Sequence, residues 1–316
     1  FADTFNPVEL TRDLLGPTWM NWPSTSFEIK TLDPKRFLTV PTHAGLVVLS
    51  NQTNIEEFVE SNVAFGKKCT EMRKIGGVLN NVYLLKFIEN GREQKVVAKK
   101  FEEWANLKWL ALAAWSIGTQ NFSVRAKTRL ARECSSIQFL KRWAVPVPDI
   151  LHISWEKSLL ILQFIEGNSL DKFLVESSTS DEALERSTKS LRATGELLAH
   201  IHAHDFSLGD FKPENVIADS KGVNYIVDLE QAGRKGNKSW DVGEFAYYSA
   251  HLASVARRAA KESVKSFLEG YLDAGGAKSH ISRIVLPDYV KIFAPIVYPP
   301  VLYDVSRTCA NLLKRR

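Results

Sequence analysis

The sequence predicts an α+β protein with two lobes, the first rich in strands and the second rich in helices. Short apolar runs of strand length fill much of the first half of the chain, and two of them flank the turn signal Asn90-Gly91. Beyond Glu166-Gly167 the chain consists mainly of longer segments whose apolar residues recur at helical intervals. Strands followed by helices along the chain are typical of an α+β fold.

The composition is that of a globular protein with enough apolar residues for two cores. The 316 residues are 45% hydrophobic and 24% charged. A formal net charge of +5 suits an anionic ligand but is no strong signal for nucleic acid. Cys69, Cys134 and Cys309 show no CxxC spacing, so we predict neither a disulfide framework nor a zinc site and expect a cytoplasmic protein. No apolar run reaches the roughly 18 residues of a membrane span.

Residues 1–70 are expected to form an N-terminal extension of unknown role. They mix prolines with the strand-like runs "RFLTV" and "GLVVLS" and with the helix-like segment "NIEEFVESNVAF". The strand-rich lobe is predicted at residues 71–165. Within it "VYLLKFI" and "KVVAKKF" are expected to form an antiparallel hairpin, because Asn-Gly between two apolar runs favours a tight turn.

An aromatic insert is expected at residues 101–125. Its Trp104, Trp109 and Trp115 could dock a protein partner or lie at a membrane surface, or they could pack the insert onto the sheet. A helix is predicted next over "AKTRLARECSSIQFLKRW", ending at "VPVP", and the strand runs "DILHIS" and "SLLILQFI" complete the lobe. Residues 166–316 are predicted to form the helical lobe.

The stretches "GDFKPENVI" and "YIVDLEQA" bring together residues that can do chemistry. Asp210, Lys212 and Asn215 precede one short apolar run, and Asp228 ends a second run that can pair with the first. Oxygen ligands that converge at the polar ends of paired strands suit a hard cation such as magnesium. Asn215 follows Asp210 by 5 positions, and Asp228 follows Asn215 by 13.

These residues and spacings resemble the catalytic loop and metal-binding aspartate of the protein-kinase-like superfamily, H-R-D-x-K-x-x-N followed by D-F-G. The segments "RLARE", "VPVPDILHI" and "FIEGNSL" look closest to the compact atypical kinases of archaea. That group includes the RIO kinases, the kinase of the complex that makes threonylcarbamoyl-adenosine on tRNA, and the lipopolysaccharide-kinase-like proteins. The resemblance covers roughly residues 74–260.

The resemblance implies a bilobal kinase fold and transfer of the γ-phosphoryl group of ATP, with magnesium, to a hydroxyl. That hydroxyl would belong to a protein Ser/Thr or to a small polar molecule. Asp210 would orient the hydroxyl and accept its proton, and Lys212 would steady the transferring group. Asn215 and Asp228 would hold magnesium against the phosphates.

The resemblance also implies a nucleotide-binding set in the first lobe. Lys100, on one strand face with Ala98, would meet the α- and β-phosphates and pair with Glu133. Lys99 and Lys100 alternate faces, so the choice of Lys100 rests on the family pattern. Glu133 could equally pair with Arg129 on a helix surface. The remaining members would cover the phosphates or contact adenine through the backbone: Gly76, Gly77, Gln163, Phe164 and Ile165.

Three departures from the family pattern keep other functions open. Leu208 stands where the family has a histidine, and the glycine-rich loop "GGVLNNVY" lacks two of its glycines. Twelve residues separate Asp228 from Asp241, which leaves no room for a long activation segment and favours a specialised or small-molecule acceptor. The alternatives are a nucleotide-binding pseudokinase scaffold and a small ATPase that serves an RNA-modification or ribosome-assembly complex.

His200, His202 and His204 are grouped in the sequence like a metal site. Alternate positions on a helix spread the three side chains around its circumference. We therefore predict that they are helix-surface and packing residues.

Overall fold

The computed structural model describes residues 38–42, 45–49, 69–76, 81–89, 91–102, 125–155 and 157–314. The chain divides into two compact units. The first unit comprises Phe1–Leu110, Ser123–Phe139 and Pro148–Phe164, and the second comprises Ala111–Phe122, Leu140–Val147 and Ile165–Arg316. The helix-like segment of the extension and the three tryptophans of the insert lie outside the described residues, and the domain boundaries expected from the sequence stay predictions.

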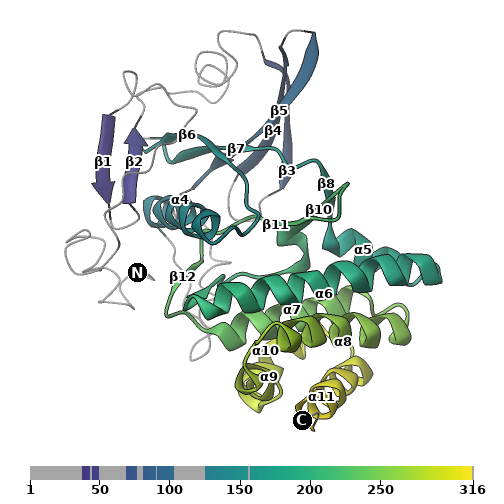
Figure 1. Cartoon of the computed structure of the whole chain (residues 1–316). Helices are drawn as coiled ribbons and strands as arrows, with labels where there is room; N and C mark the ends of the chain where they lie inside the picture. Colours follow the sequence, from purple (N-terminus) through teal and green to yellow (C-terminus); the bar gives the residue numbers. More distant parts are fainter. Residues whose placement is uncertain are drawn as a thin grey trace. The chain divides into compact units, whose positions relative to one another are not determined.

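The first unit contains an antiparallel five-stranded sheet in the order β3-β4-β5-β7-β6 (Figure 1). Its strands are β3 (Cys69–Gly76), β4 (Asn81–Glu89), β5 (Arg92–Lys100), β6 (Ile150–Ser154) and β7 (Leu159–Gln163). The two strand-like runs predicted in the extension form a separate hairpin, β1 (Leu38–Thr42) and β2 (Gly45–Leu49).

The predicted hairpin around Asn90-Gly91 is confirmed. β4 pairs with β5 from Asn81↔Lys100 to Glu89↔Arg92, and Gly91 has a left-handed φ of 74°. One face of the sheet carries a core cluster that is almost closed to solvent: Leu85, Phe87, Val96, Ala98, Leu159 and Ile161. Since alternate strand residues point to opposite faces, the even-numbered positions of β5 belong to this apolar face.

The predicted helix is α4 (Ala126–Arg142). Its Leu130, Ile137 and Leu140, which recur at helical intervals in the sequence, are all at most 1% exposed. The helix ends where Ala144 takes a left-handed φ of 55° before the "VPVP" run. The buried stripe of α4 therefore follows the periodicity seen in the sequence.

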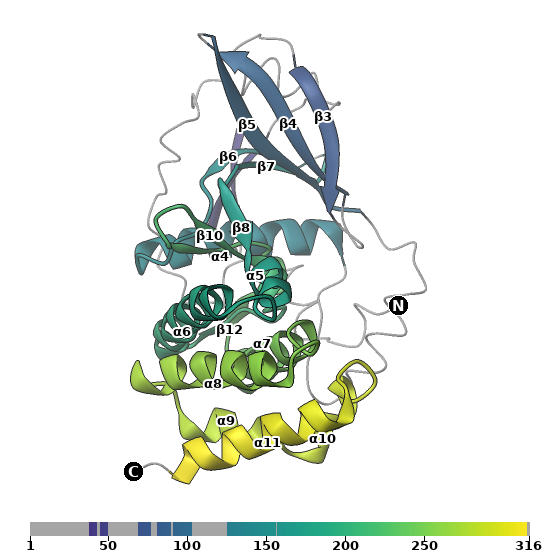
Figure 2. The same cartoon turned by 90° about the vertical axis from the view of Figure 1, so that its right-hand side faces the viewer.

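The second unit is mainly helical, as predicted. Figure 2 shows α6, α7 and α8 side by side, with α9, α10 and α11 below them. The helices are α5 (Leu170–Glu176), α6 (Asp181–Ala203), α7 (Lys238–Leu252), α8 (Arg257–Asp273), α9 (Lys278–Ile284), α10 (Pro287–Phe293) and α11 (Pro299–Lys314).

Two glycines allow α6 and α8 to approach closely. A Cβ atom on Gly195 of α6 would come closer than 3.0 Å to the carbonyl oxygen of Phe267, and one on Gly270 of α8 would collide in the same way with the carbonyl of Arg192. The backbones thus touch where larger residues would hold them apart. This contact brings the C-terminal parts of α6 and α8 together.

Short strands of the second unit flank the two loops that carry the candidate site. β8 (Gly167–Ser169), β10 (Val216–Asp219) and β11 (Asn224–Ile226) form one antiparallel sheet, and β9 (Phe206–Ser207) pairs with β12 (Gly233–Arg234). The predicted strand pair after Asn215 and before Asp228 is therefore present as β10 and β11. The first site loop runs from β9 to β10, and the second runs from β11 to β12.

Candidate active site

The loop from β9 to β10 turns sharply at Gly209. Gly209 has φ 76°, a left-handed conformation that glycine adopts without the Cβ clash of other residues. Asp210 follows it directly, and the 3₁₀ turn Pro213–Asn215 leads into β10. The side-chain amide of Asn215 donates to the backbone carbonyl of Asp210 over 2.9 Å. This bond closes the loop between the two residues.

The second loop brings Asp228 beside the first. The N–H of Val227 donates to the carbonyl of Asn215 over 2.9 Å, so the residue before Asp228 is hydrogen-bonded to the end of the 3₁₀ turn. Asp228 itself has φ 59°, a conformation that costs free energy for a residue with a Cβ and that occurs often at functional sites. The structure thus places Asp210, Asn215 and Asp228 on two adjoining loops, as the spacing predicted.

Lys212 lies among acidic groups. Its Nζ is 2.6 Å from Asp210 Oδ1 and 4.0 Å from Glu244 Oε1, and it lies 5.4 Å from the ring centroid of Tyr248. Burial alone would lower the pKa of the Lys212 ammonium, but Asp210, Glu244 and Tyr248 outweigh burial and the pKa is raised. Lys212 is therefore a permanent cation beside the Asp210 carboxylate.

Glu244 is a site residue that the sequence did not reveal. Its Oε2 accepts hydrogen bonds from Phe211 N at 2.8 Å and from Trp240 Nε1 at 2.9 Å. Burial and the nearby Asp210 raise the pKa of this carboxyl well above its ordinary value, against the opposing effect of Lys212. Glu244 lies in a region predicted only to be helical, and an acidic residue there gives no sequence signal for a contact with Phe211, 33 positions earlier.

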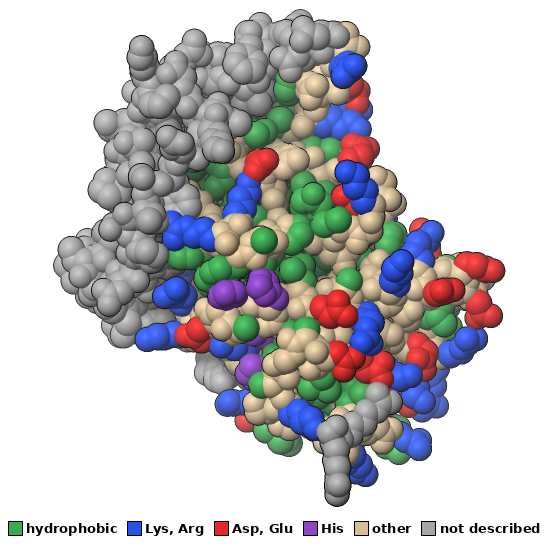
Figure 3. All heavy atoms as spheres, viewed as in Figure 1, with side chains coloured by type: hydrophobic (Ala, Val, Ile, Leu, Met, Phe, Trp, Pro, Cys, Tyr) green, Lys and Arg blue, Asp and Glu red, His purple; other side chains and the backbone are tan. Residues whose placement is uncertain are grey.

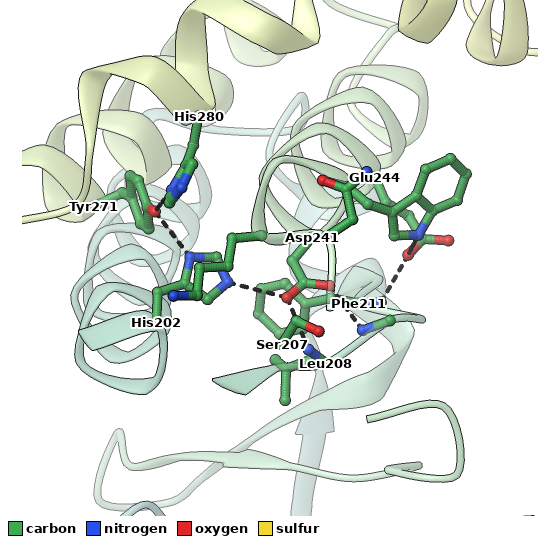
Figure 4. Close-up of polar contacts among 12 residues, drawn as sticks. His202, Ser207, Leu208, Phe211, Asp241, Glu244, Tyr271 and His280 are labelled. Carbon is green, nitrogen blue, oxygen red and sulfur yellow. Dashed lines mark hydrogen bonds and ion pairs between the residues drawn. The ribbon is translucent and has the colours of Figure 1, made fainter. Parts of the chain in front are cut away.

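Asp241, three residues before Glu244 on α7, holds the other side of the loop (Figure 4). Its Oδ2 accepts from Leu208 N and its Oδ1 accepts from Gly209 N, both over 2.7 Å, and its side chain is fully buried. Asp241 and Glu244 thus bind backbone N–H groups on both sides of Asp210. Hydrogen bonds to a carboxylate are strong, so the loop is anchored although Leu208 replaces the expected histidine.

The three histidines have different surroundings. His202 is buried and its Nε2 donates to Asp241 Oδ2 over 3.0 Å. His200 contacts the Trp143 carbonyl at 2.9 Å, and the His204 ring stacks on the Trp143 ring with centroids 4.3 Å apart. Figure 3 shows histidine side chains adjacent on one face of the molecule. All three therefore make packing or hydrogen-bond contacts, and His202 also belongs to the site.

The pairing expected between Lys100 and Glu133 in the first unit is wrong by one residue. Lys99 Nζ lies 2.7 Å from Glu133 Oε2, and the two side chains are 5% and 1% exposed. Lys100 instead donates to the carbonyl of Lys157. The reason is the strand alternation: Lys100 shares the face of Ala98, which the apolar core covers, whereas Lys99 points to the face on which α4 provides Glu133.

The remaining nucleotide-binding candidates are only partly placed. Gly76 ends β3 opposite Val82, and Gly77 lies outside the described residues. The N–H of Gln163 already donates to the carbonyl of Asp149 over 2.8 Å, so this donor is not available to adenine. Phe164 is the last residue of the first unit, and Ile165, the first of the second, is 7% exposed.

Residues 90–271 match the model of a protein family described as the lipopolysaccharide kinase (Kdo/WaaP) family. The chain belongs to this family. No curated protein matches the chain. The matched segment begins at the β4–β5 turn and ends in α8, so it contains Lys99, both site loops and the two carboxylates of α7.

Membership of the lipopolysaccharide kinase family makes the chain a kinase of the protein-kinase-like superfamily, with the bilobal fold of that superfamily and a nucleotide as phosphoryl donor. Among the relatives that the sequence resembles, the lipopolysaccharide-kinase-like proteins are the confirmed group. No helix among the described residues combines the length and the apolar character that crossing a membrane requires.

The oxygen donors of this candidate site fit a divalent cation. The amide nitrogen of Asn215 is engaged with the Asp210 carbonyl, which leaves its Oδ1 as a donor, and Asp228 adds a carboxylate. Amide and carboxylate oxygens are the ligands that magnesium prefers in proteins.

Proposed function

We propose that the chain transfers the γ-phosphoryl group of ATP, with magnesium, to a saccharide hydroxyl of the lipopolysaccharide type. The arrangement of Asp210, Lys212 and Asn215 is the observation that carries the proposal. A carboxylate, a permanent cation and an amide oxygen are held on one anchored loop, which is what phosphoryl transfer by positioning and charge neutralisation requires.

Asp210 is the residue proposed to receive the acceptor hydroxyl. Its carboxylate would accept a hydrogen bond from the hydroxyl and then its proton as the oxygen attacks the γ-phosphorus. Lys212 would stay charged throughout, because its acidic neighbours raise its pKa. It would therefore balance the charge that develops on the transferring group.

Other residues are proposed to bind the nucleotide. Lys99, in place of Lys100, would contact the α- and β-phosphates, and Glu133 would keep its side chain extended. Magnesium, held by Asn215 and Asp228, would neutralise phosphate charge when bound. With the Gln163 donor engaged, the adenine contact would pass to the backbone of Phe164 and Ile165.

Two observations favour a saccharide over a protein Ser/Thr acceptor. The family that matches the chain is named for lipopolysaccharide kinases. The segment from Asp228 to α7 is also short, because α7 begins at Lys238 and Asp241 is already bound to the loop of Asp210. A long peptide-docking segment has no place in this connection. A cytoplasmic location and a protein partner of the tryptophan-rich insert stay predictions.

The proposal is tested by incubating the protein with γ-labelled ATP, magnesium and either purified lipopolysaccharide or a peptide library that contains Ser and Thr. We expect label on the lipopolysaccharide. Asp210→Asn should reduce transfer by at least about a hundredfold, because the proton acceptor is lost. Asp219→Asn is the matched control, since Asp219 is another aspartate of this region but ends β10 and accepts through its Oδ1 from the turn of the β10–β11 hairpin.

Three results would contradict the proposal. Label on peptides alone would make the chain a protein kinase. Nucleotide binding without transfer to any acceptor would favour the pseudokinase scaffold, and phosphate release without a labelled acceptor would favour the ATPase.

A further inference from the structure

A line of polar side chains, buried up to Tyr271 and half-buried at His280, extends from the candidate catalytic loop to α9 (Figure 4). Asp241 contacts His202 Nε2 at 3.0 Å, and His202 Nδ1 lies 2.8 Å from the hydroxyl of Tyr271 on α8. The same hydroxyl lies 2.6 Å from Nδ1 of His280 on α9. Neither Tyr271 nor His280 belongs to the roles assigned above, and both lie on helices that carry no other candidate site residue.

The chemistry of these groups sets the direction of each hydrogen bond when His202 is neutral. The Asp241 carboxylate can only accept, so His202 carries its proton on Nε2. Its Nδ1 must then accept, and the Tyr271 hydroxyl donates to it. The Tyr271 oxygen is left to accept from His280 Nδ1–H.

The surroundings of the two outer residues agree with this order. Burial raises the pKa of the Tyr271 hydroxyl, which therefore keeps its proton, and burial lowers the pKa of His280 to about 4, so that its ring is neutral at neutral pH. The turn from α8 to α9 holds the tyrosine ring in place. Gly276 N donates to the Tyr271 carbonyl over 2.8 Å, and a Cβ atom on Gly276 would collide with the ring.

We propose that Tyr271, supported by His280, is a positioning residue for the catalytic loop: its hydroxyl holds the His202 ring in the orientation in which Nε2–H donates to Asp241. Without the Tyr271 hydroxyl, Nδ1 of His202 would be a buried acceptor without a donor, and the ring would turn toward another donor. Nε2–H would then move away from Asp241 Oδ2. Asp241 would turn away from Leu208 N and Gly209 N, and the backbone before Asp210 would lose its anchor. The inference rests on the proposed function of Asp210.

The first test compares Tyr271→Phe with the wild type. We expect kcat for phosphoryl transfer to fall about tenfold while KM for ATP stays within about twofold, because the catalytic loop and not the nucleotide contacts is disturbed. Tyr247→Phe is the matched control. Tyr247 is another fully buried tyrosine, and its hydroxyl donates to the carbonyl of Ile284 over 3.0 Å, away from the loop. Loss of the Tyr247 hydroxyl should lower the free energy of unfolding but leave kcat unchanged.

The second test changes His280. His280→Asn keeps a side-chain N–H in the place of Nδ1–H, whereas His280→Leu removes the donor. We expect the asparagine variant to retain most of the wild-type kcat and the leucine variant to lose several-fold. Equal rates for the two variants would overturn the role of His280.

The hydrogen bonds of His202 are measured directly by two-bond ¹⁵N–¹H correlation of histidine-labelled protein, assigned with His202→Gln. The expected result is a neutral ring with its proton on Nε2 in the wild type, and altered ¹⁵N shifts of both ring nitrogens in Tyr271→Phe as their hydrogen bonds are lost. An unchanged Nε2 shift in Tyr271→Phe, a doubly protonated His202 in the wild type, or equal kcat values for Tyr271→Phe and Tyr247→Phe would each overturn the proposal. If the wild type transfers no phosphoryl group, the proposed function fails, and the spectra still decide whether Tyr271 fixes His202.

Discussion

Lys99 on β5 and Glu133 on α4 form an ion pair 2.7 Å long, and both side chains are almost completely buried. Removing one partner from such a pair leaves the other charge in the interior, which typically costs about 3–5 kcal/mol. We therefore expect Lys99→Met to lower the free energy of unfolding by about that amount and to abolish ATP binding. Lys100→Met should change both far less, because Lys100 is only partly buried and contacts the Lys157 carbonyl.

Urea denaturation and titration calorimetry with ATP measure these two effects. Lys99→Met/Glu133→Leu separates them, because it removes both charges. The double variant should recover most of the lost stability without recovering ATP binding. Stronger loss of ATP binding in Lys100→Met than in Lys99→Met would contradict the prediction and make Lys100 the lysine that contacts the phosphates.

Glu244→Gln should make stability less sensitive to alkaline pH. The folded-state pKa of Glu244 is raised by burial and by Asp210, so its contribution to stability is complete below the unfolded pKa of 4.5 and is lost as pH rises through the folded pKa. The stability of the wild type relative to Glu244→Gln should thus be lower at pH 8 than at pH 5. Urea unfolding at both pH values checks this, with the half-exposed Glu262→Gln of α8 as control. If the wild type and Glu244→Gln differ in free energy of unfolding by the same amount at both pH values, the pKa of Glu244 is not raised by burial.

His152 should cause the opposite pH dependence in the first unit. Burial lowers its pKa from 6.5 to about 3, so the folded state binds fewer protons than the unfolded state between these values. Its contribution is complete above pH 6.5 and declines as pH falls, by about 2 kcal/mol at pH 5. His152→Gln should reduce the stability lost between pH 7.5 and pH 5, as measured by urea unfolding. An equal loss in the variant and the wild type would contradict the prediction.

The contact between α6 and α8 should not tolerate a methyl group. Gly270→Ala forces a Cβ atom against the carbonyl of Arg192, and relief requires the two helices to move apart. Overpacking of this kind typically costs about 1–3 kcal/mol, and we expect the upper part of that range because the contacted atom is backbone. Gly233→Ala is the control, since a Cβ atom there meets nothing within 4 Å. Thermal melting of the two variants distinguishes them, and equal midpoints would show that the helices adjust.

The sequence predicted the parts of the site that are close together along the chain. Asp210, Lys212 and Asn215 lie within six consecutive residues, and Asp228 follows across a single hairpin. Their spacing alone therefore limits where the side chains can lie. The hairpin of β4 and β5 was predictable for the same reason, because Asn90-Gly91 sets the register of the strands on either side.

The predictions that were wrong or incomplete concern contacts that depend on packing between distant segments. "KVVAKK" has apolar residues on both strand faces, so alternation could not tell whether Lys99 or Lys100 points to α4. Glu244 binds Phe211 N from 33 positions away, and only the packing of α7 against the loop brings them together. His202 was expected to be a packing residue, and its contact with Asp241 depends on α6 lying beside α7.

The two carboxylates of α7 have a consequence for the motion of the loop. The N–H groups of Leu208, Gly209 and Phe211 all donate to side chains of one buried helix, so none of them can exchange its hydrogen with solvent unless the loop separates from α7. Loops usually exchange quickly through local fluctuations. Here the residues around Asp210 should be protected from deuterium as long as the core of α7 is, which would make the reactive loop part of the same cooperative folding unit as the helix behind it.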